Sequence, residues 1–395
     1  MNRMLNLQKI AIVTSHPIQY NAPLFSQLAT RKNIEIKVFY TWGTSKETVF
    51  DPGFGKELKW DIPLLEGYEY EFLYNKSRKP GTHHFFGLIN PNSIQAIKKF
   101  QPDVVLVYGW SFYSHLKILF FFKNRVLVVF RGDSHLLDEE KAFSFRKLLR
   151  RVSLRWIYLY VDYFLYVGRA NKDYYIKHGV SNNKLIFAPH CVDNAFFCLN
   201  SEEKENEAKT WRESLGIKED EIVFIFVGKF ESKKDPYLLL NAFIQIESTR
   251  IKLIFVGNGK EEKRMKEIAK YDSRISFIDF QNQSRMPIVY RLADVLVLPS
   301  KGPRETWGLV VNEAFACNRP VIVSDKVGCH FDLIKQNETG WVFPSGDTVK
   351  LKELITSISN LKKYEISKIG ENAFLLIQKW NYTKVASVIE KLDKS

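Results

Sequence analysis

Short apolar runs recur along the chain and alternate with longer segments that suit helices. Val104–Tyr108 and Ile222–Val227, for example, are continuous apolar runs rather than alternating ones, which is typical of strands covered on both faces. The expected strands are Ile10–Ser15, Ile36–Tyr40, Tyr70–Tyr74, Val104–Tyr108, Val126–Phe130, Phe164–Val167 and Leu185–Ala188, then Ile222–Val227, Leu253–Val256, Ile275–Ile278, Val295–Leu298 and Val321–Val323. Together they predict parallel sheets with helices on both faces.

The two groups of strands predict two doubly wound, Rossmann-like α/β domains with a cleft between them. Asn200–Lys209 is polar and charged without an apolar period, so we expect the boundary between the domains there. We assign residues 1–200 to the first domain, 201–372 to the second and 373–395 to a C-terminal helix. Ligands of open parallel sheets bind beyond the carboxyl ends of the strands, where we therefore expect the functional side chains.

Cysteine spacing and hydropathy exclude several classes of protein, and the distribution of charge indicates a partner. The 395 residues include four widely spaced cysteines with no C-x-x-C pair, which predicts reduced thiols rather than disulfides or a zinc site. The most apolar stretch, Leu116–Phe130, is too short and too charged to span a bilayer. Of the net charge of +14, most lies in residues 1–195, which hold 27 Lys and Arg against 16 Asp and Glu. An anionic partner of the first domain is therefore expected.

Residues 141–160 concentrate this charge in one predicted amphipathic helix. Its apolar positions recur at helical spacing, and Lys147, Arg151 and Arg155 form a stripe of cations. Two interpretations stay open. The helix lies against anionic lipid headgroups, or it packs on the core and presents a solvated basic face. The apolar positions are Phe145, Leu149, Val152, Trp156 and Leu159.

The most informative segment of the second domain begins at the strand Val295–Leu298. The strand runs into Pro299-Ser300, a turn follows, and a helix is expected from about Gly308. Glu305 would precede that helix, whose N-terminus favours an anion, and Glu313 would lie two turns into it. Two carboxylates beside a positive helix end suit a ligand that carries both hydroxyls and phosphates, such as a sugar nucleotide. Taken alone, the glutamates could equally be a dipole partner and a solvated helix residue.

The surrounding motifs resemble the retaining glycosyltransferases of family 4, which have the GT-B fold. Their signature is two glutamates separated by seven residues after a strand that ends in Pro-Ser, and Glu305–Glu313 fits it. Val227–Asp235 resembles the family's phosphate motif, with Lys229 where the family usually has Arg, and Pro189–Asp193 resembles its linker motif. The match covers nearly the whole second domain and the first only loosely. It implies a C-terminal helix that packs back on the first domain.

The resemblance also implies roles for individual residues of the donor site. Glu313 would bind the ribose hydroxyls and Glu305 the donor sugar, while Lys229 and Lys234 neutralise the diphosphate, with Lys233 as a competitor for the second position. Two lysines in these places remove the need for a metal or another cofactor. The other residues expected to contact the donor are Gly228, Thr306, Trp307, Gly308, Leu309, Phe280, Gln281 and Arg169.

The first domain departs further from the family and is expected to bind the acceptor. His16 follows the first strand and is predicted to take part in catalysis, with Gln19 and Asn21 nearby on the acceptor side. The candidates after the fifth strand are Arg131, Asp133 and His135, whose individual roles the spacing leaves open.

The sequence thus predicts a cytoplasmic enzyme, peripheral at the inner face of the membrane. It would move a sugar, with retention, from a nucleotide-diphosphate donor, UDP-sugar first, to a saccharide or lipid-linked acceptor in surface polysaccharide or glycolipid synthesis. A GT-B-fold epimerase is the alternative within enzymes, and a basic nucleic-acid-binding protein is the alternative outside them. No recognised nucleic-acid-binding module occurs, so we expect no nucleic acid partner.

Overall fold

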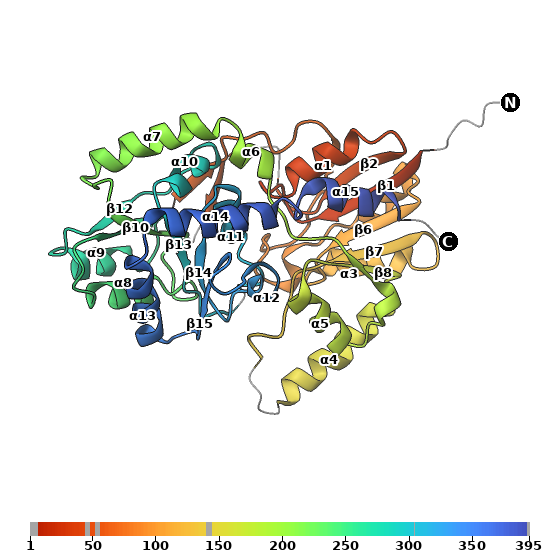
Figure 1. The fold of residues 1–395 in the computed structure, drawn as a ribbon. Helices are drawn as coiled ribbons and strands as arrows, with labels where there is room; N and C mark the ends of the chain where they lie inside the picture. The colour runs from red at the N-terminus through yellow and green to blue at the C-terminus, as the bar shows by residue number, and fades with distance from the viewer. Residues whose placement is uncertain (1–6, 44–47, 52–55, 140–143, 304, 393–395) are drawn as a thin grey trace. The chain divides into compact units, whose positions relative to one another are not determined.

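A computed structural model describes residues 7–43, 48–51, 56–139, 144–303 and 305–392. Its contacts divide the chain into two compact units, the first from residues 1–47, 63–189 and 382–395, the second from 48–62 and 190–381. Each unit holds one large parallel sheet (Figure 1). Two Rossmann-like sheets are the architecture that the continuous apolar runs predict.

The sheet of the first unit has the strand order β5-β2-β1-β6-β7-β8-β9. Every residue of β7 is buried, as is expected of a strand with helices on both faces. The strands are β1 (Gln8–Thr14), β2 (Ile34–Tyr40), β5 (Glu69–Phe72), β6 (Val104–Tyr108), β7 (Leu127–Arg131), β8 (Tyr163–Tyr166) and β9 (Leu185–Phe187). The helices are α1 (Ala22–Ala29), η1 (Phe85–Gly87), α2 (Ser93–Phe100), α3 (Tyr113–Phe122), α4 (Phe145–Tyr158), α5 (Arg169–Lys177), η2 (Asn182–Lys184) and α15 (Tyr382–Glu390).

Helix α15 comes from the end of the chain but packs on α1 of the first unit. Gln27 donates to the Thr383 hydroxyl over 3.0 Å, and Asn33 donates to Glu390 over 3.0 Å. The Tyr382 hydroxyl donates to the Tyr20 carbonyl over 2.9 Å. Polar contacts at both ends of α15 therefore hold the last helix against the first.

The second unit has the strand order β12-β11-β10-β13-β14-β15 and a separate antiparallel pair, β3-β4. All six residues of β10 are buried. The strands are β3 (Thr48–Asp51), β4 (Lys56–Lys59), β10 (Ile222–Val227), β11 (Ile251–Val256), β12 (Ile275–Ile278), β13 (Val295–Leu298), β14 (Val321–Ser324) and β15 (Gly340–Phe343). The helices are α6 (Asn194–Cys198), α7 (Ser201–Ser214), α8 (Pro236–Ile244), α9 (Glu262–Ala269), η3 (Gln283–Arg285), α10 (Met286–Arg291), α11 (Leu309–Ala316), α12 (His330–Leu333), α13 (Thr348–Ser359) and α14 (Lys363–Ile377).

Two expectations about local structure need correction. Asn200–Lys209 is not a polar linker, because Ser201–Ser214 forms the helix α7. Ala208 is its one fully buried residue, so good helix formers fold here without leaving an apolar period in the sequence. The expected strands also omit β3, β4 and β15, whose residues carry no long apolar run.

The basic helix is present as α4, although residues 140–143 lie outside the described part of the chain. Its buried residues are Leu154, Ile157 and Tyr158. The apolar stripe that the sequence picks out lies on the other side and is exposed. The helix packs on the core through a second apolar face, so it does not present a purely basic face to solvent.

Candidate functional site

The loops after β10 and β13 bring the predicted donor residues of the second unit together. These two strands are neighbours, and the strand order reverses at this point, which is where open α/β sheets bind their ligands. The first loop carries Lys229, Lys233 and Lys234 and the second carries Glu305. The backbone nitrogen of Lys301 donates to the Lys233 carbonyl over 3.0 Å, which ties one loop to the other.

Glu305 lies at the centre of a buried polar cluster. Its side chain pairs with the Lys234 ammonium over 2.5 Å and accepts from the Ser300 hydroxyl over 2.8 Å. The residue is 6% exposed. Burial alone would favour the neutral acid, but the charge of Lys234 and the two hydrogen bonds outweigh it and lower the pKa of Glu305. The cluster therefore holds one cation and one carboxylate, both charged, next to the start of α11.

Lys233 does not share this arrangement. Its ammonium pairs with Glu231 over 3.2 Å and its side chain is more exposed than that of Lys234. Of the two lysines that compete for the diphosphate position, Lys234 is the one that contacts Glu305. Lys229, at the start of the same loop, is partly buried.

Glycines allow the close approach of backbones around this cluster. Gly308 precedes α11 with φ at +93°, and a Cβ there would lie 2.7 Å from Cγ1 of Val327. Gly257 follows β11, and a Cβ there would lie 2.1 Å from the carbonyl oxygen of Gly228. Larger residues at either position would push the strand-end loops apart.

The segment from Thr306 to Leu309 leads into α11. The nitrogen of Cys329 donates to the Trp307 carbonyl over 3.0 Å, so the segment is fixed to the loop after β14. The indole of Trp307 is buried and donates to Asn312 over 2.8 Å. It also packs 5.3 Å from the ring of Trp380. Trp307 is thus a packing side chain, and its backbone rather than its ring borders the N-terminus of the helix.

Glu313 lies on α11 and is 2% exposed. The Tyr290 hydroxyl donates to one of its carboxylate oxygens over 2.5 Å, and the Gln283 amide lies 3.5 Å from the other. Helix α10 and the short helix before it therefore hold this carboxylate. A solvated helix residue would have no such partners, so the simpler interpretation of Glu313 does not fit.

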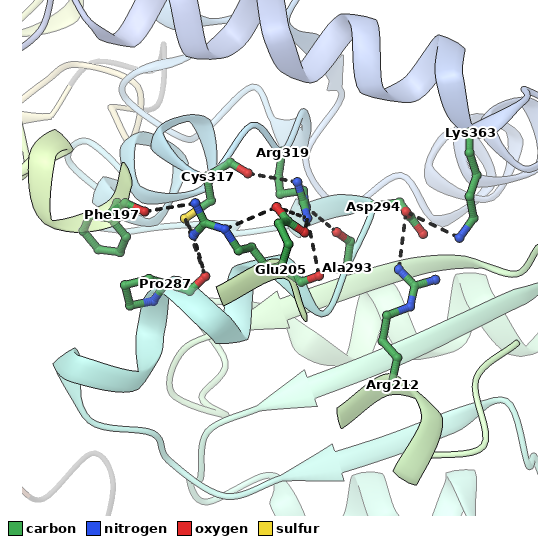
Figure 2. A network of polar contacts seen from close by, with 10 residues as sticks. Phe197, Glu205, Arg212, Pro287, Ala293, Asp294, Cys317, Arg319 and Lys363 are labelled. Atoms are coloured by element: carbon green, nitrogen blue, oxygen red, sulfur yellow. Dashed lines mark hydrogen bonds and ion pairs between the residues drawn. The ribbon is translucent and has the colours of Figure 1, made fainter. Parts of the chain in front are cut away.

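A network of arginines fixes α10, the helix that carries Tyr290 (Figure 2). Arg291, next to Tyr290 and 4% exposed, donates to the Phe197 carbonyl over 3.1 Å and pairs with Glu205 over 3.2 Å. Arg319 pairs with the same carboxylate over 2.8 Å. The network links α7 and α6 to α10, and so it helps to set the position of the Tyr290 hydroxyl.

Phe280 and Gln281 follow β12 at the same end of the sheet. The nitrogen of Phe280 donates to the Asn258 side chain over 3.0 Å, and the Gln281 amide donates to the Asp279 carbonyl over 3.1 Å. Asn258 follows β11, so one side chain links the ends of two neighbouring strands. This fixes the backbone around Phe280 and Gln281, which the resemblance assigns to the donor.

In the first unit, His16 follows β1 and is partly buried. Its Nδ1 lies 2.9 Å from the Ser15 hydroxyl, and its ring packs 5.2 Å from Trp42. Burial lowers the pKa of His16. Asn21 is the residue before α1 and makes no side-chain capping bond, and Gln19 lies two residues earlier.

The remaining candidates of the first unit lie at the carboxyl ends of β7 and β8 or just after them. Arg131 is buried and donates to the carbonyls of Ala188 and Pro189 over 2.8 and 3.0 Å, so its guanidinium fixes the chain after β9. His135 is buried and its Nδ1 accepts from the nitrogen of Leu137 over 3.1 Å. Asp133 lies between them, and the exposed Arg169 begins α5. These residues share the carboxyl end of the sheet, where Arg131 and His135 bond to backbone groups.

Sequence reasoning missed the partners that hold the two glutamates. Ser300, Gln283 and Tyr290 are not among the predicted site residues, although each contacts Glu305 or Glu313. Only Ser300 carried a signal, since it lies two residues after a buried strand. The other two lie more than twenty residues from Glu313 along the chain, and only the fold brings them together.

Comparison with known proteins gives this arrangement a context. Residues 207–375 match the family described as "Glycosyl transferases group 1". An uncharacterized glycosyltransferase of Methanocaldococcus jannaschii is 33% identical over 37% of this chain and 37% of its own length. The lipopolysaccharide 1,2-N-acetylglucosaminetransferase of Salmonella typhimurium is 25% identical over 50% of this chain and 55% of its own. The alignments thus span between about a third and about a half of these curated relatives.

Solved structures resemble the chain over nearly its whole length. Anabaena HepE in complex with UDP and glucose gives a TM-score of 0.70 at 16% identity, covering 97% of this chain and 98% of its own. A glycosyltransferase of Rickettsia africae gives 0.72 at 16% identity, covering 99% and 100%. These likenesses confirm the predicted GT-B fold. The family match concerns residues 207–375, and the structural likeness concerns the fold.

Proposed function

We propose that this chain is a retaining, metal-independent glycosyltransferase of family 4. It would transfer a sugar from a UDP-sugar to a hydroxyl of a saccharide or lipid-linked acceptor in surface polysaccharide or glycolipid synthesis. The observation that carries the proposal is the buried cluster of Lys234, Glu305 and Ser300 at the switch point of the second sheet. A charged pair taken out of water costs free energy, and ligand binding offers a reason to retain it there.

The second unit would bind the donor. Glu313, oriented by Tyr290 and Gln283, has carboxylate oxygens that suit the two hydroxyls of a ribose. The N-terminus of α11 and the ammonium groups of Lys229 and Lys234 suit the diphosphate. UDP is the first nucleotide to test because HepE, which shares the fold, is described in complex with UDP.

The reaction would break the bond between the anomeric carbon and the β-phosphate oxygen. The acceptor hydroxyl would form its bond to that carbon on the same face, and its proton would pass to the departing phosphate, so that UDP is released. The charge that develops on the diphosphate would be stabilised by Lys229, Lys234 and the helix amides, without a metal. Glu305 would hold hydroxyls of the donor sugar, so that catalysis rests on positioning and electrostatics.

The first unit would bind the acceptor through residues at the carboxyl end of its sheet. His16, Gln19, Asn21 and Asp133 are the candidates for this role, because the guanidinium of Arg131 already bonds to the carbonyls of Ala188 and Pro189 and the ring of His135 accepts from the backbone nitrogen of Leu137. His16 would be neutral near pH 7, because burial lowers its pKa, and a neutral imidazole can accept a hydrogen bond from a hydroxyl.

The test is an assay of UDP release with a panel of UDP-sugars, with and without saccharide and lipid-linked acceptors, in the presence of EDTA. We expect acceptor-dependent UDP release that EDTA leaves unchanged, and NMR of the product should show the anomeric configuration of the donor. Glu305→Ala should lower transfer by about 10²-fold or more while UDP still binds. Unchanged transfer in this variant would contradict the proposal, as would an inverted product. A changed sugar nucleotide formed without any acceptor would indicate an epimerase instead.

A further inference from the structure

Helix α4 of the first unit turns an apolar face outward. Its inner face packs on the core through Leu154, Ile157 and Tyr158. The outward side chains, exposed by between 44% and 68%, are Phe145, Leu148, Leu149, Val152 and Trp156, with Leu159 directly after the helix. They recur every three or four residues and so form one continuous stripe. A continuous stripe of this kind on a folded unit marks an interaction surface, whereas scattered exposed apolar residues would not.

Cations border this stripe on both sides. Each helical residue advances the direction of its side chain by about 100°, so Arg146 lies on one flank of the stripe and Arg155 on the other. Both are exposed, and neither forms an ion pair within the described part of the chain. The helix Phe145–Tyr158 contains five Lys and Arg and no Asp or Glu.

Two other arginines of α4 bond to side chains of the first unit. Arg150 donates to the Tyr174 hydroxyl over 3.0 Å, and Arg151 pairs with Glu139 over 3.2 Å. Both contacts lie on the side of the helix that faces the unit. They attach α4 to α5 through Tyr174 and to the chain before α4 through Glu139. The helix therefore has an attached inner side and an outer side made of apolar residues with cationic flanks.

We propose that this outer side docks on an anionic lipid bilayer. The stripe would lie in the boundary between headgroups and acyl chains, and Arg146 and Arg155 would reach lipid phosphates. The cations and the apolar stripe together favour a bilayer over two other partners, a nucleic acid and a second copy of the chain. A nucleic acid would cover the cations but would leave the apolar stripe without an apolar partner. A second copy on the stripe would bring two rows of cations together, which opposes association. The proposal rests on α4 alone and does not depend on the proposed function.

The first test is sedimentation of the full chain with vesicles of phosphatidylcholine, and with vesicles in which about a third of the lipid is phosphatidylglycerol. We expect binding to the anionic vesicles. The double variant Leu149→Glu, Val152→Glu should bind these vesicles at least about tenfold more weakly, since its two substitutions remove apolar contacts and add charges that the anionic lipid repels. The matched control is Val349→Glu with Leu375→Glu in the second unit, because these side chains are 65% and 64% exposed. It should bind as the wild type does.

The second test separates charge from apolar insertion. Arg146→Gln with Arg155→Gln should weaken binding to the anionic vesicles by about thirtyfold, or about fivefold for each charge. Lys263→Gln with Lys368→Gln removes two exposed cations from the second unit and should change little. Added salt should weaken wild-type binding and should affect the Arg146→Gln, Arg155→Gln variant less.

The third test identifies the face that touches lipid. The chain has eight tryptophans, so the fluorescence shift on adding anionic vesicles is compared between the wild type and Trp156→Phe. The variant should still bind but lose most of the blue shift. The proposal is overturned if the wild type ignores anionic vesicles, or if the α4 variants bind them as the wild type does. It is also overturned if the α4 substitutions instead dissolve a dimer or abolish binding to RNA. Each readout is independent of sugar transfer.

Discussion

The two sheets share one plan, but they use the polar residues at the carboxyl ends of their strands differently. In the second unit Lys234, Glu305 and Ser300 bond to one another, and Glu313 bonds to Tyr290 and Gln283. In the first unit Arg131 bonds to the carbonyls after β9. Side chains that bond to one another form a site that a ligand can rearrange, whereas side chains that bond to backbone mainly hold the fold. The difference follows the resemblance, which is specific in the second unit and loose in the first.

The largest expected effect separates two neighbouring lysines. Lys234→Met should lower the rate of sugar transfer by about 10²- to 10³-fold, because it removes the cation that pairs with Glu305 and that, in the proposed function, stabilises the leaving diphosphate. Lys233→Met should lower it by less than about tenfold, since that lysine pairs with Glu231. Kinetics with saturating donor measure both. The reverse order of effects would show that Lys233 occupies the diphosphate position.

A second prediction concerns a buried histidine of the first unit. His115 bonds to the Thr41 hydroxyl and the Gly109 carbonyl over 3.0 Å each, and burial lowers its pKa to about 4. The neutral form therefore contributes stability that is fully present above about pH 6.5 and is lost as the pH falls toward 4, by about 3 kcal/mol in all.

Chemical denaturation of the first unit's transition at several pH values measures this effect. In His115→Gln the free energy of unfolding should fall less steeply over that pH range than in the wild type. His83→Gln changes an exposed histidine of the same unit and should keep the wild-type slope. Equal slopes in all three proteins would contradict the assignment.

A smaller effect on stability is expected at Arg131. Arg131→Lys loses the two-pronged contact with the carbonyls of Ala188 and Pro189 and should cost about 2 kcal/mol of unfolding free energy. Transfer at saturating donor should change by less than about fivefold. A stable variant with a greatly raised KM for acceptor would instead give Arg131 the acceptor role that the sequence predicts.

The smallest effect is expected at Tyr290. Tyr290→Phe removes one hydrogen bond to Glu313 and should weaken UDP binding by about tenfold, because the carboxylate loses part of its orientation. Titration calorimetry measures the change. Tyr237→Phe, on α8 in the same unit, is the control and should bind UDP as the wild type does.

The elements best predicted from sequence are those buried on both faces. β10 and β13 have their predicted bounds, because a fully buried strand needs a continuous apolar run. Helix α7 was missed because Ala208 alone is fully buried in it. For α4 the helical period of the apolar residues identified a stripe, but it did not show whether this stripe faces the core or the solvent. Leu154, Ile157 and Tyr158 form a second apolar face of the same helix, and this face is the buried one. Choosing the face that meets the core requires the neighbouring elements.

The residues of the candidate site also differ in whether local sequence features could predict them. The expected strand, turn and helix start predicted Glu305 and Glu313 from local features of the sequence, and the resemblance added Lys234, which the structure brings into contact with Glu305. It could not supply Tyr290 or Gln283, whose contact with Glu313 depends on how α10 packs on α11. Residues that bond across elements are found only when those elements are placed.

The central claim is that the switch point of the second sheet binds a nucleoside diphosphate through Glu313. Thermal shift with UDP, GDP and ADP, each with and without attached sugar, tests it most directly in the wild type, Glu313→Ala and the exposed control Glu338→Ala. UDP at ~100 times its dissociation constant should stabilise the wild type and Glu338→Ala by about 2.7 kcal/mol. Glu313→Ala should lose that shift. An equal shift in Glu313→Ala, or no shift of the wild type with any of these nucleotides, would contradict the account.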